Sequence, residues 1–156
     1  MSLASFNIVL IAPEIPQNTG AIGRLCVNTE AKLHLVKPLG FSLDESRLRR
    51  AGMDYWQHLN LEVYESWQDF LRQNQPKRLF FCSTKAQKSV YSLSFKAGDY
   101  LVFGNEGHGL PAAFYQEYRQ YLYSIPMPGP QARSLNLANA VAIVLYEAMR
   151  QTKFAK

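Results

Sequence analysis

The sequence predicts an α/β fold built on a mainly parallel sheet. Short apolar runs, which are typical of strands buried on both faces, alternate along the chain with stretches of helical periodicity. Several of these runs end in polar or glycine-rich segments, as at Glu14–Gly20 and Gly104–Pro111. The length of 156 residues is close to that of one ordinary domain, so we expect residues 1–156 to form a single domain.

Apolar runs, several of them closed by proline or glycine, predict the strands. In chain order they are Phe6–Ala12, Leu33–Val36, Leu61–Tyr64, Arg78–Ser83, Tyr100–Phe103 and Leu122–Ile125. Between the fourth and fifth runs, Tyr91, Leu93 and Phe95 alternate with polar residues, which predicts a partly exposed strand or an extended loop. Strands that alternate with helices favour parallel pairing, because each return of the chain needs a crossover.

The segments between the first three predicted strands have helical patterns. Gln17–Glu30 carries apolar residues at i, i+3, i+4 and i+7, and Asn18 or Thr19 is available to cap its first turn. Ser42 and Glu45 have the spacing of a capping box. That box predicts a basic helix that would contain Arg47, Arg49 and Arg50.

The later intervals are also helical. Ser66 with Asp69 predicts a capped helix through Leu71, and Pro111 starts a helix that runs to about Arg119. The final helix, Leu137–Thr152, has an unusually wide apolar stripe, so we expect it to cover two surfaces.

Composition excludes several classes of protein. With 47% hydrophobic and 19% charged residues and no biased tract, the chain is typical of folded proteins. No stretch approaches the roughly 20 apolar residues that span a bilayer, and no signal peptide is visible, so we expect a cytoplasmic protein without membrane contact. The net charge of +5 suits an RNA partner but would also suit an ordinary enzyme. Cys26 and Cys82 lie in apolar surroundings without metal-ligand spacing, which predicts reduced thiols and no metal site.

Three polar or glycine-rich clusters follow predicted strands, where ligands bind in open α/β sheets. The first is Glu14–Gly20 with Arg24 one turn into the helix, and the second is Gly104–Pro111. The third runs from Ile125 through a proline-rich loop to Asn136 and Asn139. Each cluster alone has an ordinary structural interpretation as a turn or a helix cap. Their order along one chain is the more specific signal.

This ordered set resembles the three motifs of the SPOUT RNA methyltransferases, and the resemblance covers nearly the whole chain. Pro13–Gly20, Leu33–Phe41 and Arg47–Tyr55 further resemble the small TrmL (YibK-like) tRNA 2′-O-methyltransferases, which consist of the catalytic domain alone. The resemblance implies a deep trefoil knot at the C-terminal side, bound S-adenosylmethionine, a homodimer and a tRNA substrate. It further implies methylation of the wobble nucleotide, position 34, of leucine tRNAs.

The resemblance also assigns residues. The catalytic set would be Arg24, Ser134 and Asn136, with Arg24 at the attacking ribose hydroxyl. The cofactor would be held by Cys82, Ser83, Gly104, Glu106, Gly109, Ile125, Ser134 and Leu135. RNA would contact Asn18, Lys85 and Arg133. Glu106 has a second interpretation, as a structural carboxylate that holds backbone amides.

Two features depart from the TrmL pattern: Asn105–His108 in the second motif and a longer Pro128–Ala132 loop in the third. They keep open 2′-O-methylation of rRNA or of another tRNA position. A non-catalytic RNA-binding protein of the same fold is the alternative from another class. The joint presence of Arg24, Ser134 and Asn136 favours the enzyme, since a binding protein would need none of them.

Overall fold

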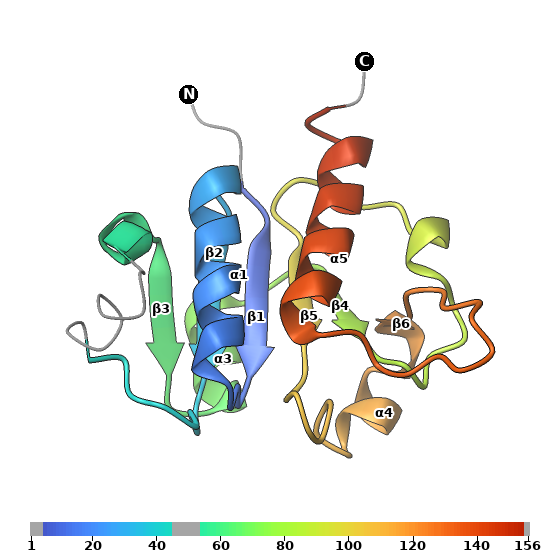
Figure 1. Ribbon diagram of the computed structural model, residues 1–156, viewed down its shortest axis with the longest axis horizontal. Helices are drawn as coiled ribbons and strands as arrows, with labels where there is room; N and C mark the ends of the chain where they lie inside the picture. The colour runs from blue at the N-terminus through green and yellow to red at the C-terminus, as the bar shows by residue number, and fades with distance from the viewer. Residues whose placement is uncertain (1–4, 45–53, 155–156) are drawn as a thin grey trace.

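The computed structural model describes residues 5–44 and 54–154. It contains a six-stranded sheet in the order β3-β2-β1-β5-β4-β6, in which every pair of neighbours is parallel (Figure 1). The strands are β1 (Asn7–Ile11), β2 (Lys32–Val36), β3 (Leu61–Tyr64), β4 (Leu79–Cys82), β5 (Tyr100–Phe103) and β6 (Leu122–Tyr123). The predicted α/β fold with a mainly parallel sheet is therefore confirmed.

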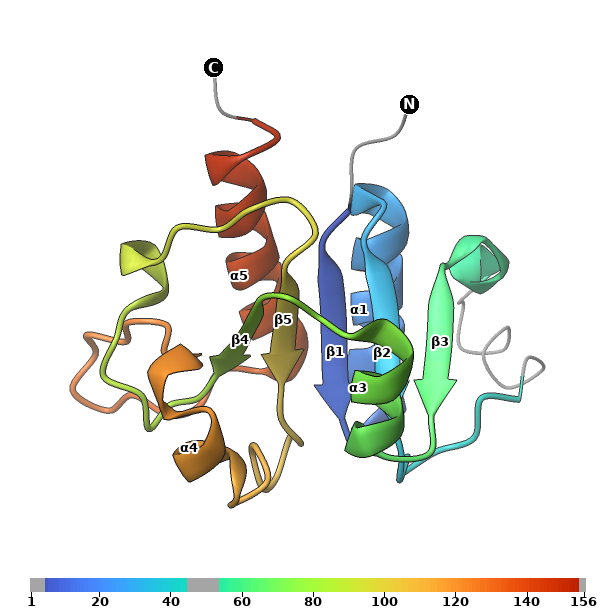
Figure 2. The ribbon, with the colours of Figure 1, turned by 180° about the vertical axis from the view of Figure 1, so that it is seen from behind.

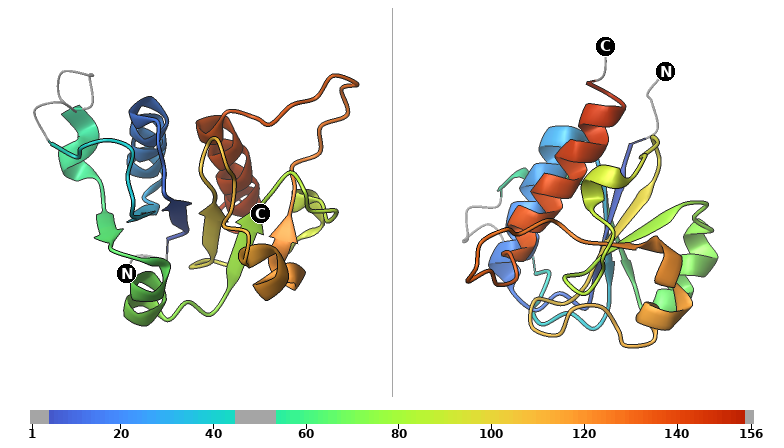
Figure 3. Two further views of the ribbon diagram at one scale, coloured as in Figure 1. Left: turned by 90° about the horizontal axis from the view of Figure 1, so that it is seen from below. Right: turned by 90° about the vertical axis from the view of Figure 1, so that its right-hand side faces the viewer.

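Helices lie on both faces of this sheet. They are α1 (Pro16–Thr29), α3 (Trp67–Asn74), α4 (Phe114–Glu117) and α5 (Leu137–Gln151), with 3₁₀ helices η1 (Asp54–His58), η2 (Val90–Ser92) and η3 (Arg119–Tyr121). Helices α1 and α5 lie side by side on one face (Figure 1), whereas α3 and α4 lie on the other, as the view from behind shows (Figure 2). The end-on views separate the two helical layers (Figure 3).

Two hydrophobic cores follow from these layers. Under α1 and α5, fully buried Leu10, Leu35 and Leu101 from the sheet pack with Ile22 of α1 and Val144 of α5. The other core is aromatic and is made by side chains of β4, α3 and α4, namely Phe81, Trp67, Phe70 and Phe114. The ring centroids of Trp67 and Phe114 lie 4.9 Å apart, within the usual range for a favourable aromatic pair.

Side-chain caps are present at the start of α3 and α5 but not at the start of α1. Ser66 accepts a hydrogen bond from the backbone N–H of Asp69, and Asn136 caps α5, as predicted. The predicted cap of α1 is wrong: Ile15 is its N-cap residue and contributes no side-chain bond, while Asn18 and Thr19 lie buried inside the helix. Pro16 begins α1 without needing an amide partner.

Three segments differ from the predicted elements. Residues 90–92 form η2, and the chain around it is a loop without a strand, so of the two predictions the loop is correct. The helix predicted from Pro111 to about Arg119 is shorter and breaks into α4 and η3. The last strand ends at Tyr123, before the predicted Ile125. The predicted basic helix through Arg47, Arg49 and Arg50 lies outside the described residues.

The strand order reverses direction at the centre of the sheet. From β1 the chain builds outward to β2 and β3, whereas β5 and β4 are added on the opposite side of β1. The pairing of Leu10 with Phe103 brings the carboxyl ends of β1 and β5 level with each other. In open α/β sheets this reversal point opens a crevice for ligands, so a binding site is expected there.

Candidate active site

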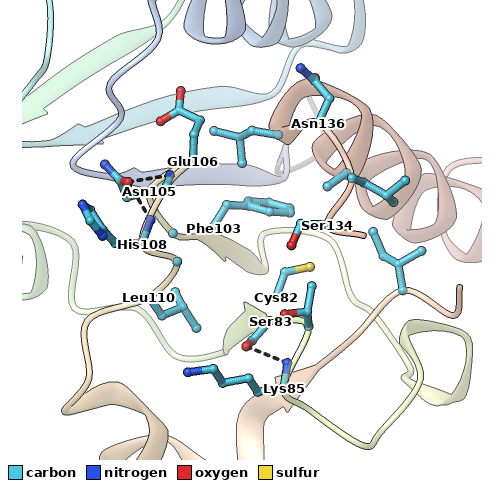
Figure 4. Close-up of a pocket in the computed structure, with 18 of the residues that line it drawn as sticks. Cys82, Ser83, Lys85, Phe103, Asn105, Glu106, His108, Leu110, Ser134 and Asn136 are labelled. Carbon is cyan, nitrogen blue, oxygen red and sulfur yellow. Dashed lines mark hydrogen bonds between the residues drawn. The ribbon is translucent and has the colours of Figure 1, made fainter. Parts of the chain in front are cut away.

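A cavity of about 450 Å³ lies beyond the carboxyl ends of β4 and β5, beside the start of α1. Figure 4 shows Glu106 and Asn136 towards one end of it and Ser83 and Lys85 towards the other. It is lined by Ile15, Asn18, Cys82, Ser83, Thr84, Lys85, Phe103, Gly104, Asn105, Glu106, Gly107, His108, Gly109, Leu110, Tyr115, Ile125, Met127, Ser134, Leu135, Asn136, Leu137 and Ala140. All three predicted clusters thus contribute to one cavity.

The loop that follows β5 is held in a closed turn. The Asn105 side chain donates to the Ala12 carbonyl at 2.6 Å and accepts from the amides of Gly107 at 2.8 Å and His108 at 2.9 Å. Gly104 has no room for a side chain, because a Cβ there would lie 2.2 Å from the carbonyl carbon of Gly109. The glycines therefore let two backbone segments meet at the cavity wall.

Glu106 fastens this loop to the segment that precedes α1. Its carboxylate accepts hydrogen bonds from the backbone amides of Glu14 at 2.8 Å and Ile15 at 3.0 Å, and from the Asn18 amide at 3.3 Å. Partial burial works to raise the pKa of Glu106, but these hydrogen bonds and its own backbone amide outweigh it and lower that pKa. Glu106 is thus an ionised carboxylate that holds backbone amides, as one of its two interpretations states.

Asn18 and Asn136 join the first cluster to the third. The Asn136 side-chain amide donates to the Asn18 carbonyl oxygen at 3.0 Å, while its own oxygen accepts from the amides of Ala138 and Asn139 at the start of α5. Asn18 in turn donates to Glu106. A continuous chain of hydrogen bonds therefore runs from Glu106 through Asn18 to Asn136. It fixes the mutual position of α1, α5 and the loop after β5.

A second polar group lies at the other end of the cavity. The Ser83 hydroxyl donates to the Tyr115 hydroxyl at 3.2 Å and accepts from the Lys85 amide at 3.1 Å. The Lys85 ammonium lies 5.0 Å from the centre of the Tyr115 ring, which is the geometry of a cation–π contact. Sequence reasoning missed Tyr115. Its position four residues after the predicted helix start at Pro111 was the available signal.

The predicted site residues fall into two groups. The eight predicted cofactor residues all line the cavity, and so do Asn18, Lys85 and Asn136. Arg24 and Arg133 are exposed and are not among the lining residues. Arg24 lies on the outer face of α1, with its guanidinium carbon 5.9 Å from the centre of the Tyr55 ring. One chain alone therefore does not bring Arg24 to the cavity.

Three further titratable side chains, His34, Cys26 and Cys82, are buried or partly buried. His34 is fully buried in β2, with one ring nitrogen 2.8 Å from the Tyr64 hydroxyl and the other 2.9 Å from the Asn7 side-chain oxygen. Burial, with a smaller contribution from Lys32, lowers the pKa of His34 to about 3. Burial raises the pKa of the Cys26 and Cys82 thiols to about 12, and both cysteines are free. These groups are neutral at physiological pH.

The described residues contain neither a metal-ligand cluster nor a membrane-spanning helix. Within residues 5–44 and 54–154, no group of three or more His, Cys, Asp or Glu side chains could hold a metal ion. Over the same ranges, no helix has the length and apolar character needed to cross a membrane.

Comparison with known proteins identifies the family. The model of the SpoU rRNA Methylase family matches residues 5–146. The chain belongs to this family. Within it, a tRNA (cytidine(34)-2'-O)-methyltransferase from Saccharophagus degradans is 49% identical over 152 residues, which cover 96% of this chain and 97% of that protein.

Solved structures of SpoU-type methyltransferases also match. One, described as "Structural insights into the 2-OH methylation of C/U34 on tRNA", aligns with a TM-score of 0.85 and 43% identity over 95% of this chain and 96% of that one. An AdoMet-bound rRNA methyltransferase from Sinorhizobium meliloti aligns with a TM-score of 0.81 and 25% identity, over 96% of this chain and 57% of that one. The predicted membership of the SPOUT methyltransferases agrees with these SpoU relatives.

Proposed function

We propose that this protein transfers a methyl group from S-adenosylmethionine to the ribose 2′-oxygen of the wobble nucleotide, position 34, of a tRNA. The observation that carries the proposal is the single cavity built from all three clusters, in a chain 49% identical to a tRNA (cytidine(34)-2'-O)-methyltransferase over nearly its whole length. By the same resemblance we propose leucine tRNAs as substrates, a cytoplasmic location and a knotted chain that works as one domain.

The cavity fits S-adenosylmethionine. Its volume of about 450 Å³ lies within the range of small-molecule sites. Apolar walls at Phe103 and Leu135 suit a neutral adenine, and the bare backbone at Gly104 permits close hydrogen bonding. We assign cofactor binding to the eight lining residues that the resemblance indicates, from Cys82 to Leu135. When bound, the cofactor supplies the methyl group on its sulfonium.

Arg24 would complete the site from a second copy of the chain. Its position on the outer face of α1, away from the cavity of its own chain, motivates this assignment. Helices α1 and α5 form one outer layer, on which Tyr146 and Phe154 are exposed with ring centroids 6.3 Å apart. Pairing of two copies through this layer would bury these rings and carry each Arg24 towards its partner's cavity.

In this arrangement the protein orients the attacking hydroxyl. The guanidinium of arginine keeps its proton in proteins, so Arg24 polarises the 2′-hydroxyl and does not serve as its base. Ser134 and Asn136 hold the ribose, and Asn136 is itself fixed by its bonds to Asn18 and α5. Transfer forms an O–CH₃ bond, breaks the S–CH₃ bond and releases the hydroxyl proton to solvent. Positioning of the hydroxyl against the methyl group lowers the barrier to transfer.

The test offers the purified protein total tRNA and rRNA fragments with radiolabelled S-adenosylmethionine and maps the label by nuclease digestion. We expect label on the ribose of nucleotide 34, with addition of a chelator having no effect. Label only on rRNA would favour the alternative that the Asn105–His108 departure leaves open. Absence of both methylation and cofactor binding by folded protein would contradict the proposal.

A further inference from the structure

The outer edge of the sheet, beside the cavity, carries cations and an exposed aromatic ring, of which only Lys85 also lines the cavity. We define the edge cluster as Lys85, Lys88, Arg119 and Tyr121. The three basic residues are exposed, and the Tyr121 side chain is 51% exposed. They come from the loop after β4 and from η3, which leads into the edge strand β6.

Backbone pairing brings these two segments together. The amide of Ser83 donates to the Tyr123 carbonyl at 2.9 Å, and the amide of Ser124 donates to the Lys88 carbonyl at 2.8 Å. In addition, the Lys88 ammonium lies 3.4 Å from the Gln120 carbonyl, with which it hydrogen-bonds. Because Arg119 and Tyr121 flank Gln120 in η3, the Lys88 ammonium contacts the turn that carries both of these side chains.

The charge of the edge cluster is not neutralised within the described residues. None of the ion pairs found there includes Lys85, Lys88 or Arg119. The acidic residue nearest to Arg119 in the sequence is Glu117, the last residue of α4. A single exposed tyrosine needs no explanation, but one set among unpaired cations is typical of surfaces that bind unpaired nucleotides.

The edge cluster also reaches the cavity. Lys85 both lines the cavity and lies three residues before Lys88, so their Cα atoms are at most about 11 Å apart. Cationic groups therefore lead from the cavity mouth to the sheet edge. A single-stranded chain whose 2′-hydroxyl entered the cavity could follow this path with its neighbouring phosphates.

We propose that the edge cluster is the binding surface for single-stranded nucleotides that flank the target. Lys88 and Arg119 contact phosphates, and the Tyr121 ring stacks on an unpaired base. This inference rests on the proposed function, because RNA defines the ligand. Unpaired loop nucleotides expose the base faces that an aromatic ring can stack on, whereas a paired helix does not.

The experiment measures binding separately from catalysis. Fluorescence anisotropy would measure binding of a labelled leucine-tRNA anticodon stem-loop, and of a duplex of equal charge, over a range of salt concentrations. Calorimetry would measure binding of S-adenosylhomocysteine, the demethylated cofactor. The variants are Lys88→Ala, Arg119→Ala, Tyr121→Ala and Tyr121→Phe. The matched control is Lys77→Ala, an exposed lysine just before β4, at the opposite end of that strand from the cavity.

We expect Lys88→Ala and Arg119→Ala each to weaken stem-loop binding and to lower the salt dependence by about one unit of slope. Tyr121→Ala should weaken stem-loop binding about tenfold but leave duplex binding unchanged, because only the unpaired bases stack. Tyr121→Phe keeps the ring and should bind like the wild type. Lys77→Ala should have wild-type affinity, and every variant should bind S-adenosylhomocysteine normally.

Wild-type affinity and salt slope in all three alanine variants of the edge cluster would overturn the inference, as would an equal loss in Lys77→Ala. These results are separable from failure of the proposed function. If the wild type methylates position 34 but the edge variants bind normally, only the inference fails. If the wild type methylates no tRNA while the edge variants still lose stem-loop binding, the binding surface stands and the assigned reaction fails.

Discussion

Asn18 uses both polar atoms of its side chain within the protein. Its nitrogen donates to Glu106 and its oxygen accepts from Asn136, so the residue is committed to joining two other clusters. The sequence analysis assigned Asn18 to RNA binding. These two internal hydrogen bonds leave the side chain few free donors and acceptors for an RNA contact. A buried side chain with every group paired is better suited to positioning its neighbours.

Glu106→Gln tests the loop anchor. A glutamine offers one acceptor oxygen where the carboxylate now serves the amides of Glu14 and Ile15, so one backbone amide would lose its hydrogen bond within the protein, at a cost of about 1 kcal/mol. We expect a lower melting temperature and weaker binding of S-adenosylhomocysteine. Glu14→Gln is the control, because the Glu14 side chain is exposed.

The same residue predicts a pH dependence. Hydrogen bonds lower the pKa of Glu106 in the folded state, so its stabilising contribution is present above its ordinary value of 4.5 and is lost as the pH falls through the folded value. Melting temperatures of the wild type and Glu106→Gln should therefore converge in acid. A constant difference between them from pH 7 down to acid would show that the charge of Glu106 has no role.

His34 is a base and Glu106 an acid, but both should make the folded protein less stable as the pH falls. Its folded-state pKa of about 3 is far below the ordinary value of 6.5, so only the unfolded chain binds this proton between those limits. Over that range the free energy of unfolding should fall by about 1.4 kcal/mol for each unit of decreasing pH. Urea titrations should show that His34→Gln removes this slope, whereas the exposed His58→Gln retains it.

At the scale of elements, Gly104 decides how closely the two ends of the turn after β5 approach each other. A Cβ there would lie 2.2 Å from the Gly109 carbonyl carbon and 2.4 Å from the Leu110 amide nitrogen. Gly104→Ala should therefore destabilise the fold by about 1–3 kcal/mol, and it should weaken cofactor binding because the cavity wall must move. Thermal melting and calorimetry would measure both effects. Gly129→Ala is the control, since its Cβ would meet nothing within 4 Å.

Elements whose signal is local were predictable from the sequence. The continuous apolar runs gave the strands correctly, and the Ser66 and Asn136 caps are both present. The first cap failed because Asn18 has a strong local preference for capping, yet its partners Glu106 and Asn136 are distant along the chain. The helix after Pro111 ends at Glu117, and the next residue, Tyr118, stacks on Phe81 with ring centroids 4.4 Å apart, a long-range contact that the local pattern does not contain.

At the scale of the whole molecule, the position of Arg24 leads us to expect that methyl transfer requires two chains. Arg24→Ala should abolish methyl transfer but leave binding of S-adenosylhomocysteine intact, since Arg24 is outside the cavity lining. Leu135→Glu should block the cofactor site. If Arg24 acts on its partner's site, random mixing of these two inactive variants should restore activity in about one quarter of all sites.

Sedimentation of the wild type should show a dimer of the 17.8 kDa chain. A monomer at micromolar concentration, or the lack of activity in the mixture, would contradict action across the dimer. Lys77→Ala mixed with the wild type controls for nonspecific effects of mixing, because Lys77 lies outside the α1 and α5 layer.

The sequence predicted which residues surround the cavity better than it predicted their contacts. Cluster order and the SPOUT resemblance located the eight proposed cofactor residues, all of which line the cavity. They did not locate Tyr115, which reaches the site only because α4 packs beside the loop after β4 and its hydroxyl bonds Ser83. Nor could they place Arg24, because one sequence does not specify which copy of the chain a surface residue serves.

The link between Asn136 and Asn18 has a consequence for how the protein is made. It joins residues 118 positions apart, and the anchor at Glu106 joins residues 92 apart. Contacts between residues so far apart in the sequence form slowly, because the chain loses the entropy of closing a long loop before the hydrogen bond forms. During synthesis on the ribosome, β1 and α1 emerge early, but their contacts with α5 cannot form until that helix, the last described element, has been made. A nascent chain halted before Asn136 would therefore contain all six strands of the sheet but should bind no cofactor, so we expect cofactor binding to begin only at the end of folding.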